Sequence, residues 1–184
     1  MKITELHEEL VAESGVPRSP GLHLSDIIDD FLNTLYPAQQ FKDQGEATRQ
    51  ANFEKGFIWE EVLSRAYAAR HIARPDEIIC DGVACSPDGI NLDDPANPIL
   101  EEYKCTNYSS KRPPDDNLRW ILQVKGYCYV VGVNKCIFRV LYLQGDYREH
   151  RHTLPKFYTI EFSDIELQEN WDMLIKHAKA KGML

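Results

Sequence analysis

Hydrophobic residues recur at every third or fourth position in two stretches of the first half of the chain, and this spacing predicts two helices. The first covers about residues 25–36, because Ser25 can cap its free amide groups and Pro37 ends it. The second runs from Phe53 to about His71. Its apolar stripe consists of Trp59, Val62, Leu63, Ala66 and Tyr67.

Two further helices are predicted in the second half. One is capped by Asp115 or Asp116 and runs to about Val131; it is apolar nearly all round, so we expect it to be buried between layers. The other covers residues 163–180, with Ser163 as its cap. Short or alternating apolar runs predict strands over 78–84, 99–106, 135–143 and 157–162, and residues 86–90 either continue the first of these or form a second strand. This order predicts an α/β fold with a central mixed sheet flanked by helices.

The strand over 99–106 carries adjacent acids in different surroundings. Because side chains alternate along a strand, Glu102 and Lys104 share one face and Glu101 lies on the other. Turn-forming residues fill positions 91–98, so this strand can pair as a hairpin with the segment before them. Such a hairpin brings Asp88 close to Glu102.

The helix over 53–71 also contains adjacent acids. At about 100° per residue, Glu60 lies on the flank of the apolar stripe and Glu61 points nearly opposite to it. Glu60 is therefore the acid that can face a cleft, and Glu61 is expected in solvent. A surface ion pair is the alternative for Glu60, because acids are common on helix surfaces.

Two carboxylates and an ammonium group on one hairpin form a candidate metal site. Asp88 and Glu102 can supply oxygen ligands to Mg²⁺, the backbone carbonyl of Tyr103 can supply a third, and Glu60 can bind directly or through water. Lys104 is not a ligand. It can position or help to deprotonate an attacking water, or offset the charge of a transition state. The expected chemistry is hydrolysis of a phosphodiester bond in nucleic acid.

Composition favours a single globular domain over residues 1–184, with an N-terminal arm at 1–22, a core at 53–143 and a C-terminal helix at 163–180. No apolar run approaches the ~20 residues that a membrane span needs. The N-terminus lacks the apolar core of a secretory signal. The five cysteines form no CxxC pair, so we expect reduced thiols and a cytoplasmic protein.

The net charge of −8 argues against a general nucleic-acid coat protein. The charge is uneven, because residues 106–156 hold nine Lys/Arg and four Asp/Glu, a net of +5 that leaves −13 for the remainder. A basic segment in an acidic chain favours one binding face, and a solvated surface is the alternative. The candidate contacts to nucleic-acid phosphates are Tyr108, Ser109, Lys111, Arg112, Arg119, Arg148 and Arg151. His150 and His152 lack a second pair of ligands, so no zinc site is expected.

Four motifs together resemble the PD-(D/E)XK nuclease superfamily. Pro87-Asp88 and Glu102-Tyr103-Lys104 are similar to its signature. Residues 56–60 resemble the glycine-then-glutamate helix of the branch that contains the RecB nuclease domain and the phage lambda-type exonucleases. Residues 123–127 resemble the QxxxY motif of that branch. The resemblance covers about residues 53–143.

The resemblance implies a restriction-endonuclease-like αβββαβ core, dependence on Mg²⁺ or Mn²⁺, and cleavage of DNA. It implies metal-ligand roles for Glu60, Asp88 and Glu102. It also implies a catalytic role for Lys104, and positioning of substrate or water by Gln123 and Tyr127.

Several RecB-like relatives hold an iron–sulfur cluster with one cysteine before the core and three after it. Here no cysteine precedes Cys80 and none follows Cys136, so no cluster is expected.

The sequence therefore predicts a metal-dependent DNA nuclease, either an exonuclease or a recombination, repair or phage-type nuclease, in the cytoplasm of a bacterium or a phage-infected host cell. The alternative is a catalytically silent module on the same fold that binds nucleic acid or protein. A metal-dependent hydrolase of another substrate is disfavoured, because the sequence contains no pocket motif for a small molecule. Assembly into a homo-oligomer, or with a protein partner, is left open.

Overall fold

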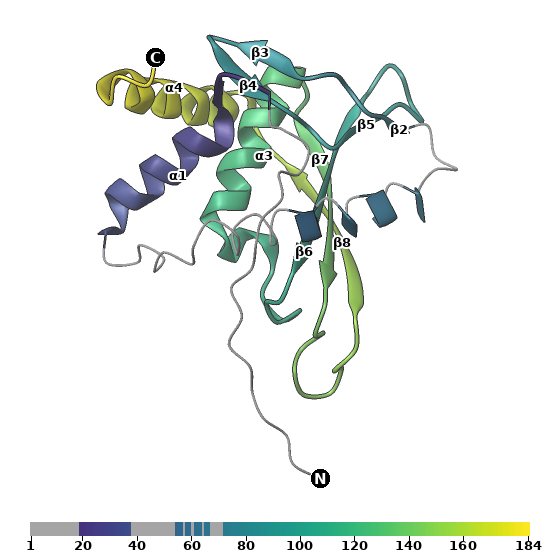
Figure 1. Cartoon of the computed structure of the whole chain (residues 1–184). Coiled ribbons are helices and arrows are strands. Elements are labelled where there is room, and N and C mark those ends of the chain that lie inside the picture. The colour runs from purple at the N-terminus through teal and green to yellow at the C-terminus, as the bar shows by residue number, and fades with distance from the viewer. Residues whose placement is uncertain (1–18, 38–53, 57, 60, 64, 67–71) are drawn as a thin grey trace.

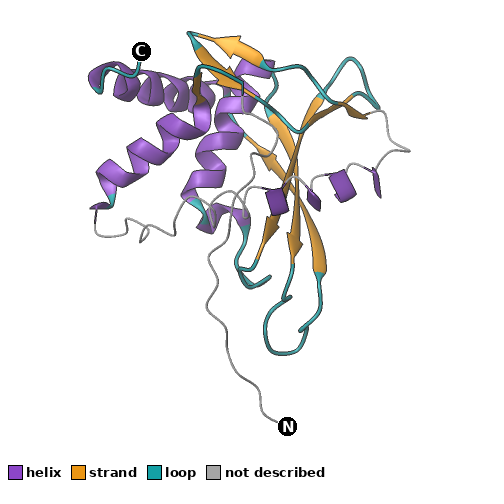
Figure 2. Ribbon diagram, viewed as in Figure 1, coloured by secondary structure: helices purple, strands orange, loops and turns teal. Residues whose placement is uncertain are grey.

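The computed structural model describes residues 19–37, 54–56, 58–59, 61–63, 65–66 and 72–184. The N-terminal half contributes β1 (Leu22–His23), α1 (Leu24–Leu35), β2 (Ile72–Ala73), β3 (Ile78–Cys80), β4 (Val83–Cys85) and β5 (Gly89–Asn91). The C-terminal half contributes β6 (Ile99–Thr106), the 3₁₀ turn η2 (Pro114–Asp116), α3 (Leu118–Val131), β7 (Lys135–Tyr142), β8 (Leu154–Glu161) and α4 (Asp164–Ala180). The expected α/β fold is confirmed, and α1, α3 and α4 gather on one side of the larger sheet (Figures 1 and 2).

The strands form two mixed sheets. The larger has the order β2-β5-β6-β7-β8, with β6 and β7 parallel and the other neighbours antiparallel. The smaller has the order β1-β4-β3, in which β1 lies parallel to β4 and β3 antiparallel to it. β6 is therefore the central strand of the larger sheet. The strand before β6 in the chain is β5, and it lies in the segment that was predicted to form a hairpin with β6.

The smaller sheet exists because the chain reverses at Asp81-Gly82, where both residues have positive φ angles of 50° and 80°. This backbone suits a tight two-residue hairpin turn. The prediction of one strand over 78–84 is wrong, since β3 and β4 are two strands. The prediction for 86–90 is also displaced, because the strand there is β5, Gly89–Asn91. Leu22, at the end of the predicted N-terminal arm, belongs to β1, and residues 1–18 of that arm lie outside the described residues.

Two of the predicted helix caps are wrong. His23 occupies the N-cap position of α1, and its backbone N–H donates to Asp26 at 3.1 Å, so Ser25 lies within the first turn. Asn117 caps α3, and its side chain accepts a hydrogen bond from the backbone N–H of Trp120.

Asp115 and Asp116 lie in the turn η2 that precedes α3. The cap of α4 is as predicted: Ser163 accepts from the N–H of Glu166, whose carboxylate accepts from the Ser163 backbone. The last predicted strand begins earlier than 157, because β8 starts at Leu154.

Helix α3 is buried between layers, as predicted. It contacts α1 and α4 on one side and β6 and β7 on the other. The contact with α1 is close at Gly126, where an added Cβ would lie 2.6 Å from Leu24 Cδ2. Leu24 is itself 1% exposed, so glycine keeps the two helices together. The apolar core continues from α3 into both neighbouring layers, through Ile27, Ile28, Leu100, Val124, Cys128, Phe138, Trp171 and Leu174.

The described residues between 54 and 66 are helical, as predicted. Glu61 is exposed and pairs with Arg65 at 3.4 Å, as expected for an acid in solvent. Leu63 is buried, but Val62 and Ala66 are exposed, so the predicted apolar stripe is only partly covered. Glu60, the predicted ligand on this helix, lies outside the described residues.

All five cysteines lie in the described part of the chain, and all are free thiols. None of the helices that the structure describes is long and apolar enough to cross a lipid bilayer.

Candidate active site

The hairpin predicted between the two acids closes. β5 pairs antiparallel with β6, with Gly89 opposite Glu101 and Ile90 opposite Leu100. Continuing this register by one residue puts Asp88 opposite Glu102. The backbone N–H of Tyr103 donates to Asp88 Oδ2 at 2.6 Å. The carboxylate of Asp88 is therefore held against β6 beside the glutamate.

The side chains of Glu102 and Lys104 meet on one face of β6, as the alternation predicts. Lys104 Nζ forms an ion pair with Glu102 Oε1 and donates to Gln123 Oε1 at 3.1 Å. Gln123 Nε2 in turn donates to the hydroxyl of Tyr127 at 2.9 Å. A continuous set of contacts thus runs from the central strand to the polar positions of the buried helix α3.

This cluster is shielded from solvent. Glu102 is 1% exposed, and Gln123 and Tyr127 are also buried. Burial raises the pKa of Tyr127, and the charge of Glu102 raises it further, so its hydroxyl stays neutral. Within the cluster, Asp88 and Lys104 are half-buried and the other three side chains are buried.

The charges of the cluster are strongly coupled. Burial raises the pKa of Asp88, although Lys104 and the N–H of Tyr103 act in the opposite direction. Burial alone would lower the pKa of Lys104, but the negative charges of Glu102 and Asp88 outweigh it and raise that pKa. Lys104 is therefore a cation at neutral pH. Arg74 also lowers the pKa of Asp88, and the charge of Glu102 raises the pKa of Arg119, so Lys104 shares the two carboxylates with arginines at longer range.

The donor chemistry suits a hard divalent cation. Asp88 and Glu102 offer carboxylate oxygens, and the carbonyl of Tyr103 belongs to the same strand as Glu102; such oxygen donors are what Mg²⁺ and Mn²⁺ prefer. Within the described residues, no group of three His, Cys, Asp or Glu side chains gathers around one point. The third predicted acid, Glu60, is outside that part of the chain.

The neighbouring acid Glu101 faces the other way, as predicted, but its partner was not foreseen. Arg139 on β7 holds it with two hydrogen bonds, from Nε at 2.7 Å and from Nη2 at 2.9 Å. Asn91 on β5 donates to the same carboxylate at 3.1 Å. All three side chains are at least nine-tenths buried. The one sequence signal for this pair was an arginine among the apolar residues of β7.

The predicted nucleic-acid contacts divide into two places. Most lie in the loops that follow β6 and β7: Tyr108, Ser109, Lys111, Arg112, Arg148 and Arg151. Of these, Arg112 lies over the ring of Tyr108, 4.9 Å from its centroid. Arg119 lies on α3 and is paired with Asp29 on α1 through two hydrogen bonds of 2.6 and 3.0 Å. Its predicted phosphate contact competes with this pair.

Comparison with known proteins gives a likeness of fold. No protein-family model matches the sequence, and no curated protein matches it. Among solved structures, the chain is similar to LHK-Exo in complex with dAMP, with a TM-score of 0.51, 15% identity and coverage of 88% of this chain and 89% of that one. LHK-Exo is an alkaline exonuclease from Laribacter hongkongensis. The chain is also similar to SSO0001, with a TM-score of 0.50, 12% identity and coverage of 88% and 78%. At these identities the likeness shows an exonuclease-like fold.

Proposed function

We propose that this protein is a metal-dependent DNA nuclease of the PD-(D/E)XK type, in the branch of the RecB nuclease domain and the lambda-type exonucleases. The observation that carries the proposal is the meeting of Asp88, Glu102 and Lys104 on the β5–β6 hairpin. Gln123 and Tyr127 complete the cluster from α3. The exonuclease-like fold supports the same class of activity.

Asp88 and Glu102 are the proposed protein ligands of Mg²⁺ or Mn²⁺, with the carbonyl of Tyr103 and with Glu60. The chemistry that such a cation supplies is polarisation of the phosphate and a lower pKa for the attacking water. The raised pKa of Asp88 supports this assignment, because an ionised carboxylate that is partly desolvated is stabilised when a further positive charge approaches it.

Lys104 is the proposed donor to the phosphate or to the attacking water. Its raised pKa keeps it protonated, so it acts as a hydrogen-bond donor and a positive charge rather than as a base. Gln123 orients it through the 3.1 Å hydrogen bond to its ammonium group. Tyr127 fixes Gln123 in turn, because its hydroxyl accepts from Gln123 Nε2. No iron–sulfur cluster is part of this proposal.

DNA is the proposed substrate. The complex of LHK-Exo with dAMP supports a deoxynucleotide ligand for this fold, and the exposed cations of the loops after β6 and β7 support contact with phosphates. Exonuclease action is favoured over endonuclease action, because the similar structures include a protein named as an exonuclease.

Incubation with end-labelled linear duplex and with covalently closed circles in Mg²⁺ or Mn²⁺ tests the proposal. The expected result is degradation of the linear DNA, abolished by EDTA and by Asp88→Ala or Lys104→Ala. Lys176→Ala, which removes an exposed cation from α4, is the matched control and should cleave as the wild type does. Cleavage of neither substrate, or equal cleavage by all variants, refutes the proposal. DNA binding without cleavage would favour the silent binding module.

A further inference from the structure

The loops after β6 and β7 form one unit at the end of the larger sheet. The backbone N–H of Ser110 donates to the carbonyl of Gly145 at 2.8 Å. Lys111 Nζ lies 3.5 Å from Asp146 Oδ2, and Lys156 Nζ donates to the carbonyl of Ser110 at 2.5 Å. We call the outer basic side chains of this unit the basic tip: Lys111, Arg112, Arg148, His150, Arg151 and His152. The loop after β7 projects beyond the strands at the bottom of Figure 1.

The β7–β8 loop is held in one shape by its own acid. Asp146 accepts hydrogen bonds from the backbone N–H groups of His150 at 2.8 Å and Arg148 at 2.9 Å, and these bonds lower its pKa. Gly145 has a φ of 53°, and an added Cβ would lie 1.8 Å from the carbonyl oxygen of His150. Tyr147 has a φ of 66°, which is strained for a residue with a side chain. The loop is thus preorganised, with Arg148 and Arg151 exposed.

The loops that carry the basic tip are less acidic than the rest of the protein. Residues 107–117 and 143–153 together contain four Lys/Arg and four Asp/Glu, a net of 0, whereas the whole chain carries −8. Two of these acids are engaged within the loops: Asp146 is 5% exposed and accepts from backbone amides, and Asp116 lies 3.8 Å from Arg112. Arg148 and Arg151 are exposed on the β7–β8 loop, as expected of cations that meet a polyanion.

The basic tip lies beyond the C-terminal ends of β6 and β7, further along these strands than the cluster that contains Glu102 and Lys104. Lys104 pairs with Val140, and Thr106 pairs with Tyr142, the last residue of β7. Two residues of strand span about 7 Å, and the β7–β8 loop extends further. A phosphate held there belongs to a nucleotide at some distance from the bond that is cleaved.

We propose that the basic tip holds the phosphate backbone of duplex DNA beyond the cleavage position. This proposal rests on the proposed nuclease function, which defines where the cleavage position is. It predicts that substitutions at the basic tip weaken binding of long DNA but do not change the hydrolysis of small phosphodiesters. Phosphate contacts of this kind position a duplex without reading its sequence.

The test compares Arg148→Ala/Arg151→Ala with Lys176→Ala/Lys179→Ala, which removes the same charge from α4. Binding of a fluorescent duplex is measured with Ca²⁺ across a salt series, and hydrolysis of bis(p-nitrophenyl) phosphate is measured with Mn²⁺. In the tip variant, the slope of log affinity against log salt should fall by about 0.9 for each phosphate that the protein no longer neutralises, while the small substrate is hydrolysed at the wild-type rate. The α4 variant should match the wild type in both assays.

Wild-type affinity and salt slope in the tip variant, or an equal reduction in the α4 variant, would overturn the proposal for the basic tip. Failure of the wild type to hydrolyse the small substrate would instead count against the nuclease function, and the salt series would still decide the role of the tip.

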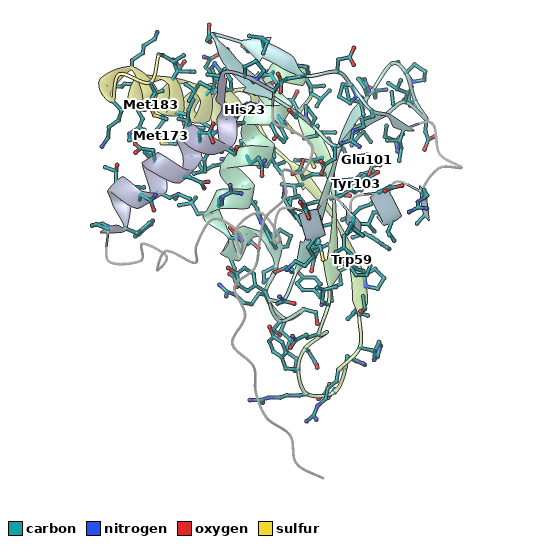
Figure 3. All side chains as sticks on the ribbon, in the orientation of Figure 1. His23, Trp59, Glu101, Tyr103, Met173 and Met183 are labelled. Atoms are coloured by element: carbon teal, nitrogen blue, oxygen red, sulfur yellow. The ribbon has the colours of Figure 1, made fainter. Side chains whose placement is uncertain are left out.

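A second, independent observation concerns the buried network of Asn91, Glu101 and Arg139. Its members come from three adjacent strands: β5, β6 and β7. One carboxylate accepts from the side chains of both neighbouring strands, at 3.1 Å from Asn91 and at 2.7 and 2.9 Å from Arg139. Figure 3 shows Glu101 beside Tyr103 within the molecule, and Glu101 is 0% exposed.

This network lies where the hairpin is short. β5 has three residues, and Asp88 directly precedes it. Asn91, at the far end of β5, also accepts from the backbone N–H of Asp93 at 2.9 Å and so joins the strand to the turn. The register that puts Asp88 opposite Glu102 therefore depends on few main-chain pairs and on the side-chain contact to Glu101.

We infer that Glu101 is a positioning residue that fixes β5, and with it Asp88, against β6. This inference also rests on the proposed metal site. Replacing Glu101 alone would bury Arg139 without its partner and could unfold the protein. The double variant Glu101→Met/Arg139→Met removes both charges while it keeps apolar volume, and such replacements of buried ion pairs are often neutral for stability.

The double variant should keep a Tm close to that of the wild type, while its Mn²⁺ affinity falls by about 10–100-fold, as is usual when a residue that orients a ligand is removed. Amide hydrogen exchange should become faster in β5 and stay unchanged in β7. Wild-type metal affinity together with wild-type protection of β5 would overturn the inference. If the wild type binds no metal, the metal site fails, and the exchange of β5 amides alone decides the role of Glu101.

Discussion

The backbone N–H of Tyr103 donates a 2.6 Å hydrogen bond to the carboxylate of Asp88, fifteen residues earlier in the chain. This bond joins the two strands of the hairpin at the point where the acids Asp88 and Glu102 meet. An acid in this position is oriented by the backbone of the strand that carries the second acid. Closure of the hairpin therefore brings the two acids Asp88 and Glu102 of the candidate metal site together.

The first prediction concerns how much the carboxylate of Asp88 lowers the stability of the folded protein when no metal is bound. Because burial is the largest influence on its pKa, Asp88→Asn should raise the Tm in EDTA or leave it unchanged. In the wild type, Mn²⁺ at about 100 times its Kd should add about 2.7 kcal/mol, or roughly 5–10 °C. The variant should not show this gain. Differential scanning calorimetry with and without Mn²⁺ measures both effects, and a metal-dependent shift in Asp88→Asn would contradict the assignment.

The second prediction is a pH dependence of metal stabilisation. The pKa of Asp88 in the folded protein is raised above its ordinary value of 3.8, so its protonated form contributes stability below that value and the contribution is lost as pH rises through the folded pKa. A cation and a proton compete for this carboxylate. The Tm gain from Mn²⁺ should therefore begin to decline, as pH is lowered, at a pH above the ordinary carboxyl value of 3.8. An undiminished gain down to about pH 4 would contradict the raised pKa.

The third prediction separates Gln123 from Tyr127. Gln123→Met keeps the volume of the side chain but removes the hydrogen bond to Lys104, so the cleavage rate should fall by about 10–100-fold, the range found when a supporting residue is removed. Tyr127→Phe leaves the contact between Gln123 and Lys104 in place and should have a smaller effect. Single-turnover cleavage of labelled duplex measures both rates. Equal reductions, or a larger reduction in Tyr127→Phe, would contradict this order.

The fourth prediction decides between two roles for Arg119. Its ion pair with Asp29 is exposed, so either Arg119→Ala or Asp29→Ala should change the free energy of unfolding by about 0–1 kcal/mol. If Arg119 also contacts phosphate, only Arg119→Ala should weaken DNA binding, and Asp29→Ala should leave it equal or stronger. Urea unfolding and duplex binding by anisotropy measure the two properties. Wild-type DNA affinity in Arg119→Ala would show that Arg119 serves only in the ion pair between α1 and α3.

The hairpin of the two acids was predictable because strand alternation and turn formers are local properties of the sequence. Alternation correctly separated Glu101 from Glu102, although they are adjacent and chemically identical. It could not identify Arg139 as the partner of Glu101, because that contact spans 38 residues and depends on the parallel pairing of β6 with β7. Such pairings are set by tertiary structure rather than by local pattern.

Helix boundaries and surface coverage were less predictable for a related reason. Serine and aspartate are common caps, but the N-cap residues of α1 and α3 are His23 and Asn117. Asp81-Gly82 is typical of a two-residue hairpin turn. The apolar residues on both sides of it favoured one continuous strand instead. Helical spacing placed Val62 in an apolar stripe, but spacing alone does not say what covers it.

Isothermal titration with Mn²⁺ tests the central claim most directly, namely that the hairpin acids form a divalent-metal site. The account predicts saturable heat for the wild type that disappears in Glu102→Gln on β6, while Glu61→Gln, which changes an exposed helical acid, titrates as the wild type does. Circular dichroism of the three proteins checks that they are folded alike. Absence of saturable heat in the wild type, or wild-type heat in Glu102→Gln, would contradict the account.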